Sequence, residues 1–254
     1  MHVIIVGVET VKVVGRVARV SVLTRMRGDR TRKESGALET HVIAANVHVG
    51  VIVCSAKQPD FHPHFIDRFL VALQVGGIAP IICINKSDLG SVLVDVQHLY
   101  AGLDFPIVEI SVRTGYGIEK LKTLLHAKST VFLGQSGVGK SSLVQTFVPR
   151  TMIEVGLVSA KRGTGKHTTT ASSLYQWEKD SFVIDTPGIR SLGVEDIPKN
   201  QLRFFFPEFA DVADSCKFRD CIHLEEPHCG VKKAVEEGLV RKARYESYCR
   251  LLEG

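Results

Sequence analysis

At residues 134–141 the chain reads Gly134-Gln135-Ser136-Gly137-Val138-Gly139-Lys140-Ser141, and this stretch decides the fold class. It satisfies the pattern G-x-x-x-x-G-K-[ST], with an apolar strand-like run before it and a helix-like segment after it. The glycines let backbone N–H groups surround phosphates, Lys140 supplies a point charge to the β and γ groups, and the Ser141 hydroxyl can ligate Mg²⁺. The stretch therefore predicts a polyphosphate site, the alternative being a glycine-rich turn with a chance lysine.

A second motif, Asn85-Lys86-Ser87-Asp88, follows the apolar run 81–84. A strand there places the motif at the carboxyl edge of a sheet, where ligands bind in α/β folds. The Asp88 carboxylate can accept two hydrogen bonds from guanine N–H groups, which adenine does not offer, and Asn85 can donate to the opposite edge of the base. This predicts guanine recognition, although N-K-x-D alone also forms an ordinary turn and helix cap.

A third motif, Asp185-Thr186-Pro187-Gly188, follows the apolar run 182–184. Asp185 is expected to hold Mg²⁺ through water, and the Gly188 N–H to contact the γ-phosphate. A simple Pro-Gly turn is the alternative for this motif alone. Three such motifs, each at the end of a strand, favour one nucleotide site.

Between residues 47 and 133, apolar runs of strand length alternate with amphipathic helical ones. This βαβ rhythm predicts an α/β fold with a mainly parallel sheet covered by helices. The rhythm stops near residue 200. We expect three parts: a partial β region at 1–41, a nucleotide-binding domain at 42–195, and a metal-binding domain at 196–254.

The order of these motifs resembles that of the circularly permuted P-loop GTPases, because N-K-S-D precedes the P-loop instead of following D-T-P-G. Among them the chain is most similar to the ribosome small subunit-dependent GTPase A family, from about Asn46 to its end. The matching stretches are 55–61, 67–70, 85–88, 134–142, 165–170, 185–188 and the terminal Cys/His cluster. The resemblance implies an N-terminal OB-type barrel, a GTPase domain and a helical zinc domain. It also implies rRNA binding and late small-subunit maturation, with hydrolysis of GTP to GDP and phosphate stimulated by that subunit.

The resemblance also implies the residues that contact the nucleotide. They are Asn85, Lys86, Ser87, Asp88, Ser111, Gly134, Gln135, Ser136, Gly137, Val138, Gly139, Lys140, Ser141, Ser142, Asp185 and Gly188. Ser111 belongs to Ser111-Val112-Arg113-Thr114-Gly115, which stands where the family has a guanine-side S-A-x-T-G loop. Val112 departs from the usual Ala, which leaves backbone recognition possible but its detail open.

The segment 165–170, Gly-Lys-His-Thr-Thr-Thr, occupies the position of a first switch loop. We expect Thr169 to close on Mg²⁺ together with Ser141 and Asp185. Ile189 stands where many GTPases carry a Gln that orients the attacking water, so a slow intrinsic rate is expected. His167 is the candidate for positioning water, beside Lys140 and Thr169 as catalytic residues, although a lone loop histidine is more often structural. A non-hydrolysing, guanine-nucleotide-dependent RNA-binding scaffold is the alternative function, and an ATP-using kinase a third.

The spacing Cys216-x₄-Cys221-x-His223-x₅-Cys229 suits a closed tetrahedral structural Zn²⁺ site, and it matches the family's zinc module. His228 is a minor alternative ligand, and Cys249 is too distant in sequence to be favoured. Cys54 and Cys83 lie in apolar runs and are expected to be small core residues. This usage fits a reducing cytoplasm better than disulfides.

Eight Lys or Arg residues and one acid lie between Lys12 and Lys33. This charge favours RNA contact and a solvated loop face about equally. The region before Asn46 is short for a complete OB barrel. The apolar run 3–6 lacks a basic leader and is far too short to span a bilayer, so we expect no membrane partner. We also expect the protein to be cytoplasmic and monomeric.

The run Phe204-Phe205-Phe206 has two interpretations. Its rings can stack on RNA bases, as aromatic side chains do in RNA-binding proteins. They can also fill the core of a small metal-stapled module, which is the favoured interpretation.

Overall fold

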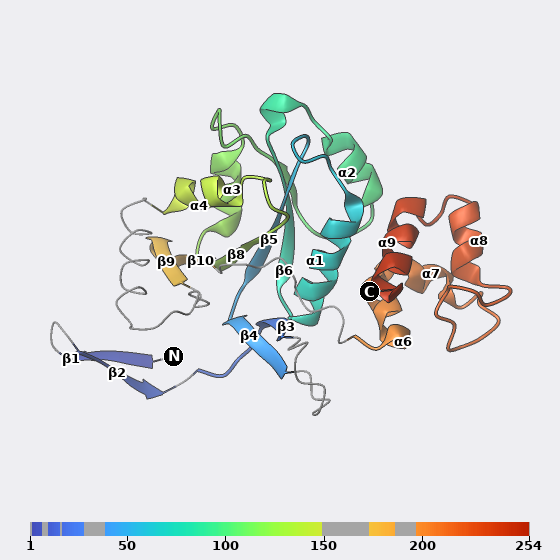
Figure 1. The fold of residues 1–254 in the computed structure, drawn as a ribbon, viewed down its shortest axis with the longest axis horizontal. Coiled ribbons are helices and arrows are strands. Elements are labelled where there is room, and N and C mark those ends of the chain that lie inside the picture. The colour runs from blue at the N-terminus through green and yellow to red at the C-terminus, as the bar shows by residue number, and fades with distance from the viewer. Residues whose placement is uncertain are drawn as a thin grey trace.

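The computed structural model of the chain describes residues 2–6, 10–15, 17–27, 39–148, 173–185 and 197–253. Its central feature is a six-stranded sheet in the order β7-β6-β5-β8-β10-β9 (Figure 1). The first five strands of this order run parallel, and β9 pairs antiparallel with β10. The strands are β5 (Val49–Ser55), β6 (Ala79–Asn85), β7 (Ile107–Glu109), β8 (Ser129–Leu133), β9 (Ser173–Glu178) and β10 (Ser181–Asp185). The expected mainly parallel sheet is confirmed.

Helices cover both faces of this sheet. Alternate residues of β5 and β6 point to opposite faces, so Ile52 and Ile82 pack in one core and Val51 and Ile81 in another. The first core includes residues of α1 (Pro63–Val75) and α2 (Leu93–Leu99), the second those of α3 (Ile118–Leu125) and α4 (Lys140–Phe147). None of the helices described is long and apolar enough to cross a bilayer.

The N-terminal region forms two antiparallel pairs, β1 (His2–Val6) with β2 (Thr10–Gly15) and β3 (Val22–Arg27) with β4 (Glu39–Ala45). The second pair is joined to the central domain, because the Val22 N–H donates to Gly76 O at 3.0 Å and Leu23 lies in the first core. Gly28-Asp29 and the polar stretch after it lie outside the described residues.

The C-terminal part is helical and lies beside α1, on the side of the sheet away from α3 and α4 (Figure 1). Its elements are α6 (Lys199–Leu202), η2 (Arg203–Phe205), η3 (Pro207–Phe209), α7 (Ala210–Ala213), α8 (Gly230–Glu236) and α9 (Lys242–Glu253). The helical C-terminus expected from the sequence is two helices. They are separated around Gly238, whose φ of +76° is a conformation that favours glycine.

Arg244 of α9 connects the C-terminal part to the central domain. Its Nε and Nη2 donate to the two carboxylate oxygens of Glu208 at 2.6 and 3.1 Å, and its Nη1 donates to Asp67 of α1. The Tyr100 hydroxyl also donates to Asp67, at 2.8 Å, and both members of the Arg244–Asp67 pair are buried. Burial disfavours the charge on Arg244, but the attraction of Asp67 and Glu208 outweighs it and raises its pKa.

Replacing Arg244 by Leu is expected to lower the free energy of unfolding by about 3–5 kcal/mol, because the Asp67 carboxylate is left buried without a counter-charge. Denaturant titration of the purified chain measures this loss. Arg250→Leu is the matched control, since this exposed arginine on the same helix is expected to change stability by less than about 0.5 kcal/mol. Equal losses in the two variants would contradict the interpretation.

Candidate nucleotide and metal sites

The carboxyl ends of four parallel strands bring the predicted nucleotide motifs to one edge of the sheet. The P-loop follows β8, Asn85 ends β6, and Asp185 ends β10. Ser111 lies two residues after the end of β7, and the Ile110 N–H between them donates to Ile84 O at 2.7 Å. Because these strands run parallel in one sheet, with β5 between β6 and β8, residues far apart in sequence meet at this edge.

The P-loop is shaped by glycines where other residues cannot fit. Gly134 has φ of +142°, and a Cβ there would lie 2.2 Å from Val53 O. Gly139, the residue before α4, has φ of +94°, and its Cβ would lie 2.4 Å from the Asn85 Nδ2 atom. The Lys140 ammonium donates to Gly134 O at 2.8 Å, and also to Gln135 O. The loop thus has the conformation that lets backbone N–H groups face a phosphate chain.

Asn85 joins the P-loop to the loop that follows β7. Its Nδ2 donates to Val138 O at 2.9 Å, and its Oδ1 accepts from the Val112 N–H at 3.2 Å. The side chain is only 2% exposed. In the structure Asn85 joins the backbones of two loops, and its contact with the edge of the base stays a prediction. The Val112 N–H therefore donates within the protein, and the contact of this loop with guanine stays a prediction.

Asp88 points toward the same loop. Its Oδ1 accepts from the Ser111 hydroxyl at 2.6 Å, and its Oδ2 lies 3.5 Å from Nη1 of Arg113. The Ser111 hydroxyl is the main cause that lowers the pKa of Asp88, and Arg113 adds to it. The carboxylate is therefore held ionised, which is the form that accepts two hydrogen bonds from guanine.

Lys86 makes a second link that sequence reasoning did not specify. Its ammonium donates to Gly137 O at 2.8 Å and to Gln58 O. Gln58 lies after β5, the strand between β6 and β8, so this contact joins three strand ends. Gln58 belongs to the stretch 55–61, one of those that resemble the GTPase family. This resemblance is the one sequence feature that indicates a role for Gln58 near the site.

Part of the expected site lies outside the described residues. This holds for the segment 165–170 with His167 and Thr169, and for Gly188 and Ile189. Asp185 is described at the end of β10, where burial raises its pKa. The preceding residue, Ile184, pairs with Val131 of β8, so Asp185 lies on the strand next to the one that leads into the P-loop.

The Cys/His motif forms a compact cluster. The ligand atoms of Cys216, Cys221, His223 and Cys229 all lie within 4.8 Å of one another. Nδ1 of His223 lies 3.6 Å from Sγ of Cys216 and 3.4 Å from Sγ of Cys229. Three sulfurs and one imidazole nitrogen at such separations can surround one tetrahedral metal ion. The cluster found among the described residues includes neither His228 nor Cys249.

Side chains around the cluster hold its backbone in place. The Glu226 carboxylate accepts from the N–H groups of Ile222 and Leu224 at 2.6 and 2.9 Å. The hydroxyls of Tyr245 and Tyr248, both on α9, donate to His223 O and Ile222 O at 2.7 Å each. These contacts fix the backbone on both sides of His223, which helps to orient its ring toward the cysteines.

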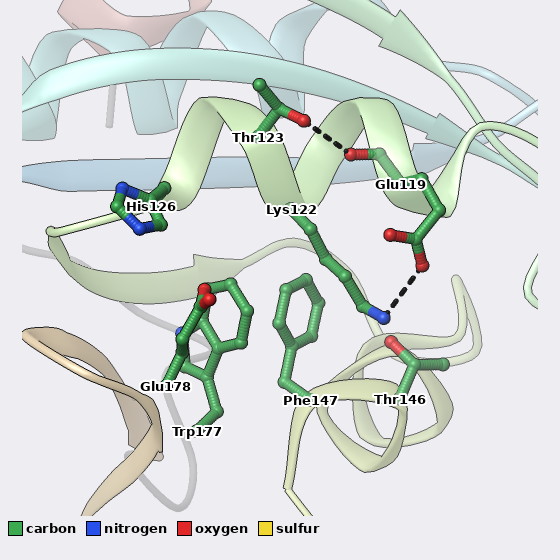
Figure 2. A pocket seen from close by; sticks show the side chains of 8 residues that line it. All are labelled: Glu119, Lys122, Thr123, His126, Thr146, Phe147, Trp177 and Glu178. Atoms are coloured by element: carbon green, nitrogen blue, oxygen red, sulfur yellow. Dashed lines mark hydrogen bonds and ion pairs between the residues drawn. The ribbon is translucent and has the colours of Figure 1, made fainter.

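A hollow of about 560 Å³ between α3, α4 and β9 is a different feature (Figure 2). Figure 2 shows Trp177 and Phe147 side by side, and their rings meet edge to face at 5.1 Å. Lys122, which faces this hollow, is paired with Glu119 at 2.8 Å. The hollow lies at the carboxyl end of α4, about 10 Å along that helix from Lys140, so it is not the phosphate site.

The fold and site define a class of protein. The strand that carries N-K-S-D precedes the P-loop strand in the chain, yet both deliver their motifs to one edge of a parallel sheet, as in a circularly permuted P-loop GTPase. The sequence model of the RsgA GTPase family matches residues 17–195. The chain therefore belongs to the RsgA GTPase family.

Individual relatives agree with this assignment. The protein named small ribosomal subunit biogenesis GTPase RsgA from Flavobacterium johnsoniae is 37% identical over 221 residues, covering 85% of this chain and 68% of its own length. Its namesake from Haemophilus influenzae is 41% identical over 216 residues, covering 83% and 62%. The chain thus spans about two thirds of the length of these curated relatives.

Solved structures are similar as well. The crystal structure of YjeQ from Thermotoga maritima has a TM-score of 0.69 at 35% identity, covering 90% of this chain and 81% of that one. The structure of YloQ, described as a circularly permuted GTPase, has a TM-score of 0.64 at 31% identity, covering 91% and 78%. These likenesses extend over the C-terminal helices as well as the sheet.

Proposed function

We propose that this protein hydrolyses GTP to GDP and phosphate on the small ribosomal subunit, assists late maturation of that subunit, and is stimulated by it. The observation that carries the proposal is the position of Asn85, which ties the P-loop to the loop beside Asp88. A phosphate loop and a base reader joined in this way suit one guanine nucleotide. The names of the relatives supply the ribosomal partner.

In the proposed mechanism the P-loop amides and Lys140 bind the β- and γ-phosphates, and Asp88 reads the base. Ser141, Asp185 and Thr169 would hold Mg²⁺, which neutralises charge on the phosphate oxygens. Asp185 suits this role, because a nearby cation would favour the ionised form that burial alone disfavours. The remaining nucleotide contacts are those predicted from the sequence, including Ser136, Ser142 and Gly188.

The protein alone is expected to orient the attacking water poorly, because the Ile189 side chain cannot form a hydrogen bond with water. We assign the role to His167 or to a group that the small subunit supplies. The intrinsic rate is therefore slow, and the partner accelerates it. If the protein binds GTP but does not hydrolyse it even with small subunits, the alternative function is a guanine-nucleotide-dependent RNA-binding scaffold.

We assign a structural Zn²⁺ to the cluster of Cys216, Cys221, His223 and Cys229. Three thiolates and one imidazole favour zinc among common metals and leave no position for a catalytic water. The proposed organisation remains a β region at 1–41 related to an OB barrel, a GTPase domain at 42–195 and a zinc domain at 196–254. We place the protein in the cytoplasm as a monomer that contacts rRNA.

The test is steady-state turnover of GTP and of ATP, with and without purified small ribosomal subunits. We expect slow turnover of GTP alone, an increase of at least tenfold with the subunits, and no comparable turnover of ATP. His167→Ala should lower the stimulated rate if this residue positions water. Turnover that small subunits leave unchanged would contradict the proposed partner.

A further inference from the structure

An exposed aromatic cavity lies on the C-terminal part, outside the nucleotide site. It encloses about 660 Å³ between η2, η3, α7 and the segment that joins Cys216 to Cys221. Two phenylalanines on its lining are solvent-exposed, Phe204 by 69% and Phe218 by 40%. Phe206, by contrast, is fully buried, so the run 204–206 is core at one end and surface at the other.

A positively charged side chain lies against each exposed ring. Cζ of Arg203 lies 4.9 Å from the centre of the Phe204 ring, and Nζ of Lys217 lies 5.5 Å from that of Phe218. Arg219 also lines the cavity, and Asp214 is the single acidic residue among the described residues of its lining. The cavity therefore combines two aromatic faces with an excess of positive charge.

This combination fits one kind of ligand better than others. Single-stranded RNA offers planar bases that stack on aromatic rings, and phosphates that pair with Arg and Lys. An apolar peptide would use the rings but would leave the cations without partners. An anion alone would use the cations but would not need two exposed phenylalanines, whose hydration is unfavourable.

Residues of the Cys/His cluster line the cavity. Phe218 belongs to a short segment whose two ends are the ligands Cys216 and Cys221, and His223 also lines the wall. Nη1 of Arg203 donates to Cys221 O at 2.7 Å and to Arg219 O at 3.2 Å, which ties the Phe204 side of the cavity to the Phe218 side. The residue before Phe204 is thus tied to the segment that carries Phe218.

We propose that this aromatic cavity binds unpaired bases of single-stranded RNA, with Phe204 and Phe218 as stacking platforms and Lys217 and Arg219 as phosphate contacts. The inference rests on the proposed function in one respect, because ribosomal RNA is then its natural source of unpaired bases. It assigns part of the RNA contact to the metal-binding module rather than to the basic N-terminal region.

The test is fluorescence anisotropy of the full chain with a fluorescein-labelled RNA of eight adenosines, and with an abasic strand of equal length. Phe204→Ala/Phe218→Ala is expected to weaken binding of the adenosine strand about tenfold or more, but binding of the abasic strand very little. Phe204→Trp should retain affinity, because it keeps an aromatic face. Leu239→Ala is the matched control, since Leu239 is 70% exposed in the same module. Bound metal and GTP affinity, measured on each variant, show that folding is preserved.

Equal binding of the adenosine and abasic strands by the wild type would overturn the proposal. So would unchanged binding by the double variant. A double variant that loses small-subunit binding but keeps its affinity for the adenosine strand would show that the cavity docks a ribosomal protein instead. Stimulation of wild-type turnover by small subunits is a separate readout, so the proposed function can fail while the cavity still binds RNA, or the reverse.

Discussion

The affinity for GTP is expected to fall about 10²- to 10⁴-fold when Asp88 is replaced by Asn, and the affinity for XTP is expected to rise. Guanine presents two N–H donors to the carboxylate, and Asn replaces one acceptor by a donor, so one hydrogen bond becomes a repulsive contact. Xanthine carries a carbonyl oxygen where guanine has its amino group, and this oxygen can accept from the Asn amide. Nucleotide specificity should therefore change without loss of the fold.

Competition of GTP, XTP and ATP against a fluorescent guanine nucleotide measures this change. Asp95→Asn is the control, since Asp95 is an exposed carboxylate on α2 and should leave all three affinities unaltered. The Ser111 hydroxyl lowers the pKa of Asp88, so the ionised form persists below the ordinary aspartate range near 4. GTP binding by the wild type should thus be retained to lower pH than binding by Ser111→Ala. Equal wild-type affinities for GTP and ATP would rule out the proposed site.

Removal of the metal is expected to lower the melting temperature by about 10 °C or more. A ligand that binds only the folded state stabilises it by about 4 kcal/mol at 1,000 times its Kd, and each kcal/mol corresponds to about 2–4 °C in a chain of this size. The ligand atoms of the three cysteines and His223 lie within 4.8 Å of one another, and without the ion they lose the shared partner that would hold them together. The segment between Cys216 and Cys229 should then lose its fixed conformation.

Calorimetry before and after treatment with a chelator, together with metal analysis, tests this expectation. We expect one metal ion per chain in the wild type, and a large loss of both metal and stability in Cys229→Ala. Cys249→Ala is the matched control, because Cys249 lies on α9 outside the cluster and should retain the ion. A metal-free chain that melts at the wild-type temperature would refute the structural role.

The sheet could be predicted from the sequence because its strands are buried. Strands covered on both faces appear as continuous apolar runs, and the runs at 47–55 and 78–84 correspond to β5 and β6 within two residues. The site edge followed from the same pattern, since parallel strands end together. The cluster of Cys216, Cys221, His223 and Cys229 was predictable because metal ligands are close in sequence.

Contacts between distant side chains were not predictable in this way. Arg244 and Asp67 are 177 residues apart, and no sequence motif indicates that they form a pair. The bridging position of Asn85 and the exposure of Phe204 likewise depend on which backbones pack against them. The favoured sequence expectation for the run 204–206 was a core position. Phe206 and Phe209 pack against Tyr248, whereas Phe204 is exposed to solvent.

The sequence by itself determined the fold class, and it predicted the guanine-nucleotide site and the four candidate metal ligands, because each of these depends on local residue types at fixed spacing. Only the tertiary structure decided how the N-K-S-D loop is tied to the P-loop, how the C-terminal part is joined to α1, and which aromatic rings face water. The physical reason is that hydrogen bonds between loops, buried ion pairs and side-chain exposure depend on distances in space. Sequence spacing does not specify those distances until the chain has folded.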